Sequence, residues 1–550
     1  MPQALMGVAA VGLLYATVRR TTQSAWAGLI AGLVLATTPV AALMFRFNNP
    51  DALLTLLLIG AVYATIRAIE APGRAVRWLA FGGALVGLAF LTKMLQAFLV
   101  LPPLALVYLV ASPTSIGTRI RHLLIAFGSM ILAAGWWIAI VELWPASSRP
   151  YIGGSQNNSI LELTLGYNGF GRLNGNETGS VGGGGGWGET GLSRLFSSEI
   201  GGQIAWLLPA AIALLVLGLW FRRSAGRSDR QLTGLIVWGG WLLVTGLTFS
   251  LMAGIFHAYY TVALAPAIAA LVGIGISIVW DHRSSVVATL GAAFVIAMTA
   301  AMAFMLLDRT STFLPWLKYV IVVVGIASAF LLVLHRLLPR RVVIAVAVAS
   351  FITMIAAPAA YAIDTATTPH TGSIPSAGPS TGGGMGGGMG GGMGRPGRGT
   401  QPTGQGAGQP GGQPHRHWWP GRPGRRRRPA VGLLLDRPDQ RSAHDGCGSY
   451  TWVGAAIGSN SASGYQLATE LPVMAIGGFN GSDPSPTLAE FQKYVADGEI
   501  HYFIASGAGG GRGMNAGGST SSAISTWVEA NFTAQTVDGV TLYDLSGGVK

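Results

Sequence analysis

Charged residues are scarce in this sequence. Only 10% of its 550 residues are Asp, Glu, Lys or Arg, while 50% are hydrophobic. Soluble globular proteins carry about 25% charged residues. Charge is expensive at mid-bilayer, so a surface that faces lipid has to lack it. The deficit therefore excludes an ordinary soluble protein and predicts a polytopic α-helical membrane protein.

Cysteine is nearly absent too. The single Cys447 excludes an internal disulfide framework and zinc sites built from paired cysteines. The net charge of +13 would suit a nucleic-acid partner, but the arginines do not gather on one face. Most lie in short loops between apolar runs, which is typical of membrane orientation, so we expect no nucleic-acid binding.

Apolar runs of about 20 residues cross a bilayer as helices. Twelve candidate spans follow one another: 4–18, 24–44, 52–69, 78–92, 94–111, 123–143, 203–221, 232–253, 259–280, 285–307, 316–337 and 342–362. Alternate loops carry most of the arginines, and the positive-inside rule assigns these loops to the cytoplasm. The large loop 144–202 and the C-terminal part of the chain then lie outside the cytoplasm. Residue 1 would also lie outside, which predicts that one further helix precedes it.

Beyond the last span, the composition changes twice. Residues 363–448 form a linker rich in Gly, Pro and Arg, whose Gly-Gly-Gly-Met repeats can bury no core. Its segment 415–448 is either a basic stretch that contacts anionic lipid or the product of a reading-frame shift. Residues 449–550 predict a small extracytoplasmic α/β domain, because strand-like and helix-like runs alternate. The expected strands are 450–457, 472–476, 501–505 and 540–543, and the expected helices are 461–470, 488–497 and 521–532. The Gly-rich stretch 507–518 lacks the Lys and Ser/Thr of a phosphate-binding loop.

Polar residues that could carry chemistry stand at the predicted outer ends of spans. The first group is Arg46, Asn48 and Asp51, where one span leaves the membrane and the next re-enters. Asn, Pro and Asp also favour an ordinary turn and helix cap. Arg and Asp together could instead hold a phosphate and a cation or a sugar hydroxyl.

A second group lies on the same side. Lys93 divides two short spans and is either a snorkelling side chain or a point charge for a lipid phosphate. His257, Tyr259 and Tyr260 open a later span. Interfacial tyrosines are common in membrane proteins, and a single His is more often structural than catalytic, so both interpretations stay open.

These motifs resemble a known family. A turn ending in Asn-Pro-Asp, then Leu-Thr-Lys two spans later, a long outer loop, and His-x-Tyr-Tyr occur in this order. The chain is thereby similar to the C-type glycosyltransferases of the protein O-mannosyltransferase and aminoarabinose-transferase kind, and most of all to bacterial mannosyltransferases of the Ykc type. The C-terminal stretches 464–468 and 475–484 resemble the extracytoplasmic domain of that type.

The resemblance implies inverting transfer of a sugar from a polyprenyl-phosphate donor to a glycan, lipid or protein acceptor. No cofactor is implied, with a divalent cation left as an alternative. By motif, Asp51 would be a catalytic acid, Lys93 would bind the phosphate, and His257, Tyr259 and Tyr260 would line the donor site with Arg46 and Asn48. The family's main catalytic acid would lie upstream of residue 1, so the first helix and first outer loop are expected to be missing here.

The sequence departs from the family pattern at two positions, and other functions compete. Met94 replaces the usual Gly after Lys, and Ala258 replaces the usual Pro. An inactive transferase remnant that serves as a membrane scaffold or binding protein is the first alternative. A transporter is the second, although the polar groups lie at one membrane face rather than at the midplane.

Overall fold

The computed structural model describes residues 1–146, 148–176, 189–370, 374–379, 450–505, 520–537 and 540–548. The chain divides into two compact units, Met1–Gly386 and Gly387–Lys550. The hypothesis of a frame shift at 415–448 and the Gly-rich stretch 507–518 both fall outside the described residues.

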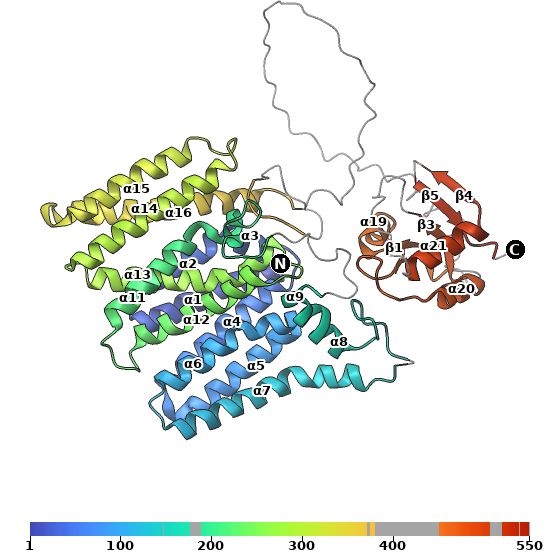
Figure 1. Cartoon of the computed structure of the whole chain (residues 1–550), viewed down its shortest axis with the longest axis horizontal. Coiled ribbons are helices and arrows are strands. Elements are labelled where there is room, and N and C mark those ends of the chain that lie inside the picture. The colour runs from blue at the N-terminus through green and yellow to red at the C-terminus, as the bar shows by residue number, and fades with distance from the viewer. Residues whose placement is uncertain are drawn as a thin grey trace, which may run out of the picture. The chain divides into compact units, whose positions relative to one another are not determined.

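The first unit is helical (Figure 1). Its first half contains α1 (Pro2–Thr22), α2 (Ala25–Thr37), α3 (Pro39–Met44), α4 (Asp51–Glu70), η1 (Pro72–Arg74), α5 (Ala75–Lys93), η2 (Met94–Val100), α6 (Leu101–Ala111) and α7 (Ile116–Leu143). The predicted large loop contains α8 (Ile160–Leu165), the single-turn π-helix η3 (Gly166–Phe170), α9 (Gly171–Asn174) and η4 (Arg194–Phe196).

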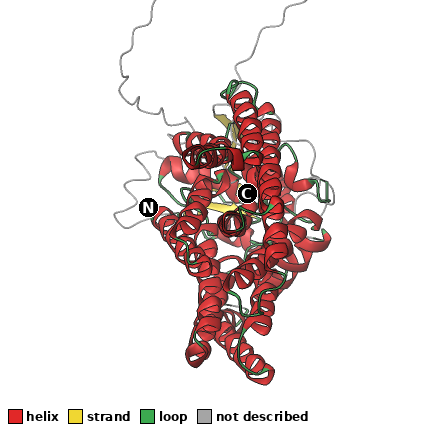
Figure 2. Cartoon of the chain, turned by 90° about the vertical axis from the view of Figure 1, so that its left-hand side faces the viewer, coloured by secondary structure: helices red, strands yellow, loops and turns green. Residues whose placement is uncertain are grey.

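The second half of this unit returns to long helices. It contains α10 (Gly201–Ile204), η5 (Ala205–Leu207), α11 (Leu208–Arg222), α12 (Arg230–Leu251), η6 (Ala258–Leu264), α13 (Ala265–Asp281), α14 (Val286–Asp308), α15 (Leu317–Val333), η7 (His335–Leu337) and α16 (Arg340–Thr367). In Figure 2 the unit consists of helices connected by loops.

Eight helices of the described residues are long and apolar enough, by length and composition, to cross a membrane. One of the eight is the run Pro72–Ala111, which covers two of the predicted spans. Each of the twelve predicted spans coincides with helix, although α2 and α15 are shorter than a usual span. The chain is thus a multi-pass membrane protein, and the number of twelve crossings stays a prediction.

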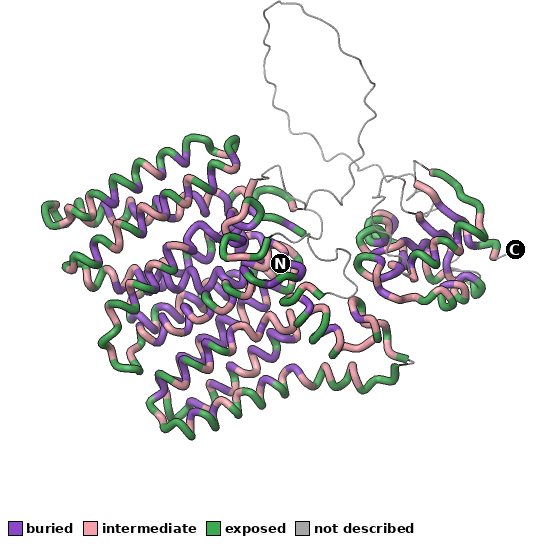
Figure 3. The backbone as a smooth tube through the Cα atoms, viewed as in Figure 1, coloured by how far each residue is buried: buried purple, intermediate pink, exposed green. Residues whose placement is uncertain are grey.

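Burial differs strongly among these helices (Figure 3). In the most apolar window of the run Ala258–Asp281, 83% of the residues are buried, against 11% for α7. A helix that is apolar all round belongs inside the bundle, and one that exposes large apolar side chains needs lipid around it. We infer that α13 forms the centre of the bundle and α7 lies at its lipid-facing edge.

Small residues bring α5 against α7. A Cβ atom added at Gly83 would lie 2.1 Å from the backbone oxygen of Ala126, and one at Gly87 would lie 2.5 Å from that of Met130. Only glycine permits this approach, which is the usual way membrane helices pack when no hydrophobic effect drives them together.

The last described residues of the first unit are attached to it by specific contacts. The Gln203 side chain donates to Ser376 Oγ at 2.9 Å and to the Ala377 oxygen at 3.0 Å, and it accepts from the Ala377 nitrogen at 2.9 Å. The predicted linker start at 363 was too early, because α16 continues to Thr367. Its apolar and helix-forming residues simply extend past the predicted span.

The second unit is a small α/β domain, as predicted. Its strands are β1 (Trp452–Ile457), β2 (Val473–Ile476), β3 (Ile500–Ile504), β4 (Ala534–Val537) and β5 (Val540–Asp544), and its helices are α19 (Ser459–Thr469), α20 (Leu488–Ala496) and α21 (Thr520–Asn531). The strand order is β2-β1-β3-β5-β4. The first three strands are parallel, and β5 and β4 pair antiparallel.

The alternation of side chains along each strand gives this sheet two buried faces. Phe503 of β3 packs with Phe491 of α20 and Val528 of α21 in one cluster. Its neighbours Tyr502 and Ile504 belong to the cluster on the other side. Period-two burial on both faces is what a sheet covered by helices requires.

Candidate functional site

The ends of α4 and α5 place an acid beside a base. Helix α4 starts at Asp51 and α5 ends at Lys93, so the two side chains meet at the same end of this helix pair. Lys93 Nζ donates to Asp51 Oδ1 at 2.6 Å and to Oδ2 at 2.8 Å. The Asp51 side chain is 0% exposed and that of Lys93 is 18% exposed. A pair this dry interacts several-fold more strongly than it would in water.

The chain turns sharply directly after Lys93. Met94 has φ 46° and ψ −134°, a conformation that favours glycine, and the α-helix gives way to the 3₁₀-helix η2. This backbone conformation is consistent with the Gly that usually follows Lys in the family that the sequence resembles. The break ends α5 at Lys93 rather than one turn later.

Three aromatic side chains at the start of η6 surround the lysine. Lys93 Nζ lies 4.0 Å from the ring centroid of Tyr260 and 5.4 Å from that of Tyr259. His257 stacks on Tyr259, with centroids 5.5 Å apart. Burial, together with the positive charges of Arg172 and Lys93, lowers the pKa of His257 to about 4. The imidazole is therefore neutral at physiological pH. One of its ring nitrogens can donate a hydrogen bond and the other can accept one.

The large loop supplies a second cation. Arg172 donates to Asn168 Oδ1 and to the Ile255 oxygen, both at 3.4 Å, and its guanidinium lies 4.6 Å from the Tyr167 ring centroid. Asn168 in turn donates to Met94 Sδ at 3.4 Å. The loop thus touches η2 through the residue that follows Lys93.

These elements enclose a cavity of about 320 Å³. Its polar wall includes Lys93, Arg172, Asn168, Gln96 and Tyr260. The remainder is mostly apolar and consists of Leu91, Met94, Leu95, Leu99, Phe170, Leu173, Phe249 and Met252, with Thr92, Gly169 and Thr248. The described wall residues include two cations and no carboxylate, and one of these cations, Lys93, is paired with the Asp51 carboxylate, which is not part of the wall.

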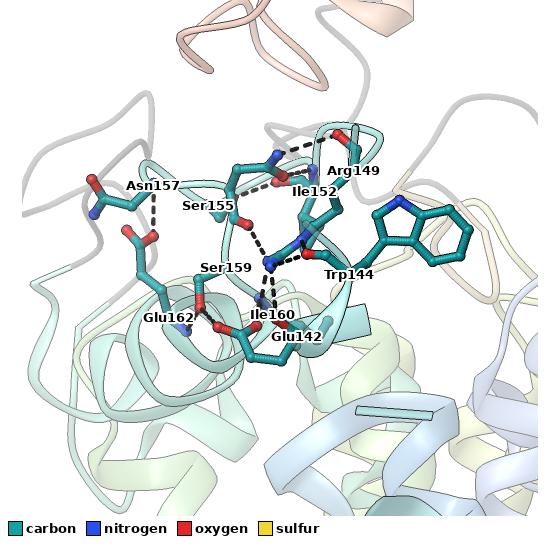
Figure 4. A network of polar contacts seen from close by, with 10 residues as sticks. Glu142, Trp144, Arg149, Ile152, Ser155, Asn157, Ser159, Ile160 and Glu162 are labelled. Carbon is teal, nitrogen blue, oxygen red and sulfur yellow. Dashed lines mark hydrogen bonds and ion pairs between the residues drawn. The ribbon is translucent and has the colours of Figure 1, made fainter. Parts of the chain in front are cut away.

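A polar network supports the loop that carries Arg172 (Figure 4). Glu142, at the end of α7, accepts from Ser159 Oγ at 3.0 Å and from the Ile160 nitrogen at 3.2 Å. Arg149 donates to the Glu142 backbone oxygen at 2.8 Å, and its Nη1 lies 3.5 Å from the Glu142 carboxylate. Glu162 accepts from two backbone nitrogens before α8, those of residues 156 and 157.

Close packing places this supported loop against the site. A Cβ atom at Gly169 would lie 2.4 Å from the Thr164 oxygen and 2.9 Å from Leu95 Cδ1. A side chain there would push the loop away from η2 and open the cavity. The segment with Arg172 is held at the cavity by its own contacts, those of Arg172 with Asn168 and Ile255 and that of Asn168 with Met94.

The structure brings five of the seven predicted site residues together, namely Asp51, Lys93, His257, Tyr259 and Tyr260. The other two, Arg46 and Asn48, are exposed in the turn before α4, and Asn48 accepts from Gln3 Nε2 at 2.8 Å. Neither lines the cavity as far as the described residues define it. Their roles in substrate binding stay predictions, and the geometry does not favour them.

Arg172 and Asn168 were missed as specific residues. Arg172 is one of three arginines in residues 144–200, and an arginine in an otherwise Gly- and Asn-rich loop is the only signal that could have singled it out. Within the described residues, no group of three or more His, Cys, Asp or Glu side chains could hold a metal ion.

Comparisons with known proteins agree with this architecture. Residues 1–138 match the family model "Dolichyl-phosphate-mannose-protein mannosyltransferase". Residues 443–531 match the model "Putative mannosyltransferase YkcB-like, C-terminal". These matches fall on the first part of the membrane unit and on the α/β domain.

Two relatives come from Bacillus subtilis strain 168. The protein named "Putative mannosyltransferase YkcB" is 29% identical, across 96% of this chain and 80% of that protein. The protein named "Putative mannosyltransferase YycA" is 28% identical, across 96% of this chain and 82% of that protein. Among solved structures, ArnT from Cupriavidus metallidurans bound to undecaprenyl phosphate aligns with a TM-score of 0.49 and 15% identity, covering 99% of this chain and 83% of that one.

The membrane helices, the C-terminal domain and these relatives together define an enzyme class: this is a membrane glycosyltransferase of the C type. Within that class the chain is similar to the Ykc-type mannosyltransferases, and the resemblance seen in the sequence is confirmed.

Proposed function

We propose that this protein transfers a sugar, with mannose as the first candidate, from a polyprenyl-phosphate donor to an acceptor hydroxyl on the outer face of the membrane. The observation that carries the proposal is the cavity between η2 and the large loop. It combines Lys93 and Arg172 with an apolar wall and lies where two membrane helices end. The names of the relatives support mannose as the sugar.

The two cations suit the phosphate of such a donor. Lys93 presents a compact charge over the Tyr260 ring, and Arg172 presents a planar fork with several donors. In the transfer, the acceptor oxygen forms a bond to the anomeric carbon and gives up its proton to water or to the leaving phosphate. The bond from that carbon to the phosphate oxygen breaks, and its electron pair stays on the phosphate. The leaving lipid phosphate gains negative charge, which two cations fixed in a dry cavity stabilise in the transition state.

The neutral groups of the cavity suit the rest of the donor. Asn168 and Gln96 offer amides that can bind hydroxyls, and Leu95, Leu99 and Phe170 offer apolar surface for the first prenyl units. The acceptor could be a glycan, a lipid or a protein, and the wall of the cavity does not favour one of them.

The proposal is tested with the full chain in vesicles that contain radiolabelled polyprenyl-phosphate mannose and an envelope extract as acceptor. The expected result is loss of label from the donor lipid, together with release of polyprenyl phosphate. A protein that binds the donor but never turns it over would instead be a scaffold. A protein that moves the intact donor across the vesicle without releasing phosphate would be a transporter.

The location of the α/β domain belongs to the same proposal. We infer that residues 363–550 lie outside the cytoplasm, because the arginine-rich loops alternate along the chain. An alkaline phosphatase fused after residue 480 should be active, and a fluorescent protein fused there should be dark. The reverse pattern would overturn the orientation and with it the outer-face assignment of the cavity.

A further inference from the structure

Asp51 has no accessible surface. Its side chain is 0% exposed, both carboxylate oxygens accept from Lys93 Nζ, and it is not among the residues that line the cavity. A general base has to come within hydrogen-bond reach of the proton that it takes. In this arrangement the carboxylate reaches Lys93 and does not face the space in which a substrate would bind.

The carboxylate is also not occupied in capping its helix. Helix α4 has no side-chain hydrogen bond at its N-cap, Pro50. The turn before it is closed by Asn49, whose Oδ1 accepts from the Asp51 backbone nitrogen at 2.9 Å. The helix end therefore makes little use of the Asp51 side chain, and its hydrogen bonds to Lys93 account for both oxygens.

The Lys93 side chain contacts Asp51 and also forms part of the cavity wall. Its ammonium donates to Asp51 on one side and lies 4.0 Å from the Tyr260 centroid, while the side chain forms part of the cavity wall. Lysine has a long flexible stem, and an isolated lysine would sample many positions before it met an anion. A buried carboxylate that is fixed by its helix holds the ammonium in one place.

We propose that Asp51 is a positioning residue that holds Lys93 toward the donor phosphate, rather than the base that deprotonates the acceptor. This inference rests on the proposed function, which places a lipid phosphate in the cavity. Asp51 would then contribute to every step in which the phosphate is bound, including binding of the product lipid that carries no sugar. A base would contribute only to the transfer step.

The test measures the binding of undecaprenyl phosphate to the full chain in nanodiscs. No proton is removed when this lipid binds, so a base is not needed. Asp51→Asn keeps the shape of the side chain and the Asn49 turn. It is expected to weaken binding roughly 10- to 100-fold, because the Lys93 ammonium loses the charge-assisted hydrogen bonds that hold it in place. Lys93→Met should weaken binding at least as much, and the double variant no further, because the two residues act through one interaction.

Asp308→Asn is the matched control. Lys318 Nζ lies 2.6 Å from Asp308 Oδ1, the same distance as in the Asp51 pair, but neither residue lines the cavity. This variant should bind the lipid as the wild type does. It removes an aspartate from an ion pair in the same membrane unit and so controls for a general loss of charge.

The outcomes separate the inference from the proposed function. If Asp51→Asn binds the lipid normally and loses only turnover, Asp51 is the base and the inference is wrong. If Lys93→Met itself binds normally, the phosphate site of the proposed function fails instead. Should Asp51→Asn not fold, the residual transfer of Lys93→Met and of the double variant is compared. Equal rates support positioning, and a further large loss in the double variant contradicts it.

Discussion

Two regions of the membrane unit contain an Asp–Lys pair of the same length in different surroundings. The shortest Nζ–Oδ distance is 2.6 Å in both the Asp51–Lys93 and the Asp308–Lys318 pair. The Asp51 side chain is 0% exposed, whereas that of Asp308 is 58% exposed. Water screens the exposed Asp308 carboxylate, so the second pair is expected to contribute less than the first, although the Lys318 side chain itself is only 11% exposed. The distance alone therefore says little about what a pair does.

What distinguishes the first pair is its neighbours. Lys93 shares a cavity with a second cation, is covered by the tyrosines of η6, and is followed by a backbone break at Met94. Lys318 lies in the first turn of α15, next to Asp308 at the end of α14, and beside the rings of Phe304 and Tyr319 at 5.6 and 5.1 Å. Each of these differences can be removed by one substitution. The effects on turnover and donor binding come first, and the effects on stability follow, each from the larger to the smaller.

The largest effect is expected from the lysines themselves. Lys93→Met removes a cation from the phosphate site and should lower donor turnover by about 10²-fold, comparable with the loss of one electrostatic stabiliser in an active site. Lys318→Met removes the same charge from the other pair and should leave turnover within about twofold, because neither member of that pair lines the cavity and the Asp308 carboxylate is exposed to water. Turnover of radiolabelled donor in vesicles measures both. If the two variants lose turnover equally, the loss in Lys93→Met comes from disturbed folding and not from a role of Lys93 in the reaction.

The second cation should have the next largest effect. Arg172→Gln retains hydrogen-bonding capacity next to Asn168 but removes the charge, and we expect donor KM to rise about tenfold, as for a lost charge-assisted hydrogen bond. Steady-state kinetics with varied donor measures it. Arg149→Gln, in the supporting network, is the companion variant, since it leaves the cavity charge unchanged. If Arg172→Gln and Arg149→Gln change KM alike, Arg172 acts through the loop rather than on the phosphate.

Much of this site could be predicted from the sequence because it follows from the order of the spans. Asp51 and Lys93 stand at the ends of consecutive spans, and antiparallel neighbours bring such ends together. Tyr259 and Tyr260 open a later span on the same side. Arg172 could not be predicted in the same way, because it lies in a loop without periodicity, and only its tertiary contacts with Asn168 and Ile255 place it at the cavity.

In the C-terminal domain, the sequence likewise predicted the elements with a local pattern and missed the one that depends on tertiary pairing. The predicted strands and helices of the C-terminal domain agree with β1, β2, β3, β5 and the three helices to within a few residues. Strand β4 was missed, because Ala534–Val537 is largely exposed and has no apolar alternation. It forms by pairing with β5, which is an interaction that a local pattern does not reveal.

The aromatic cover of Lys93 includes a histidine whose titration can be followed. The pKa of His257 is about 4 in the folded protein, below the unperturbed value of about 6.5. The unfolded chain therefore binds more protons between these two values, and stability falls as the pH drops through them. From pH 7 to pH 5 this costs about 2 kcal/mol, which His257→Gln should abolish. Thermal unfolding in detergent at several pH values measures the difference, and parallel curves for the two proteins would contradict it.

The smallest effect concerns the backbone after Lys93, which has no counterpart at Lys318. Met94 has φ 46°, where a Cβ atom is unfavourable, but its Sδ accepts from Asn168. Met94→Gly relieves the backbone and loses the sulfur contact, while Met94→Ala loses that contact and keeps the Cβ atom. The Gly variant should therefore be more stable than the Ala variant by about 1 kcal/mol, and comparison of these two variants isolates the backbone contribution. Thermal unfolding of the two variants in the same detergent measures it. If the Ala variant is as stable as the Gly variant, the break after Lys93 carries no strain, and the usual glycine of the family serves another purpose, such as room for the loop.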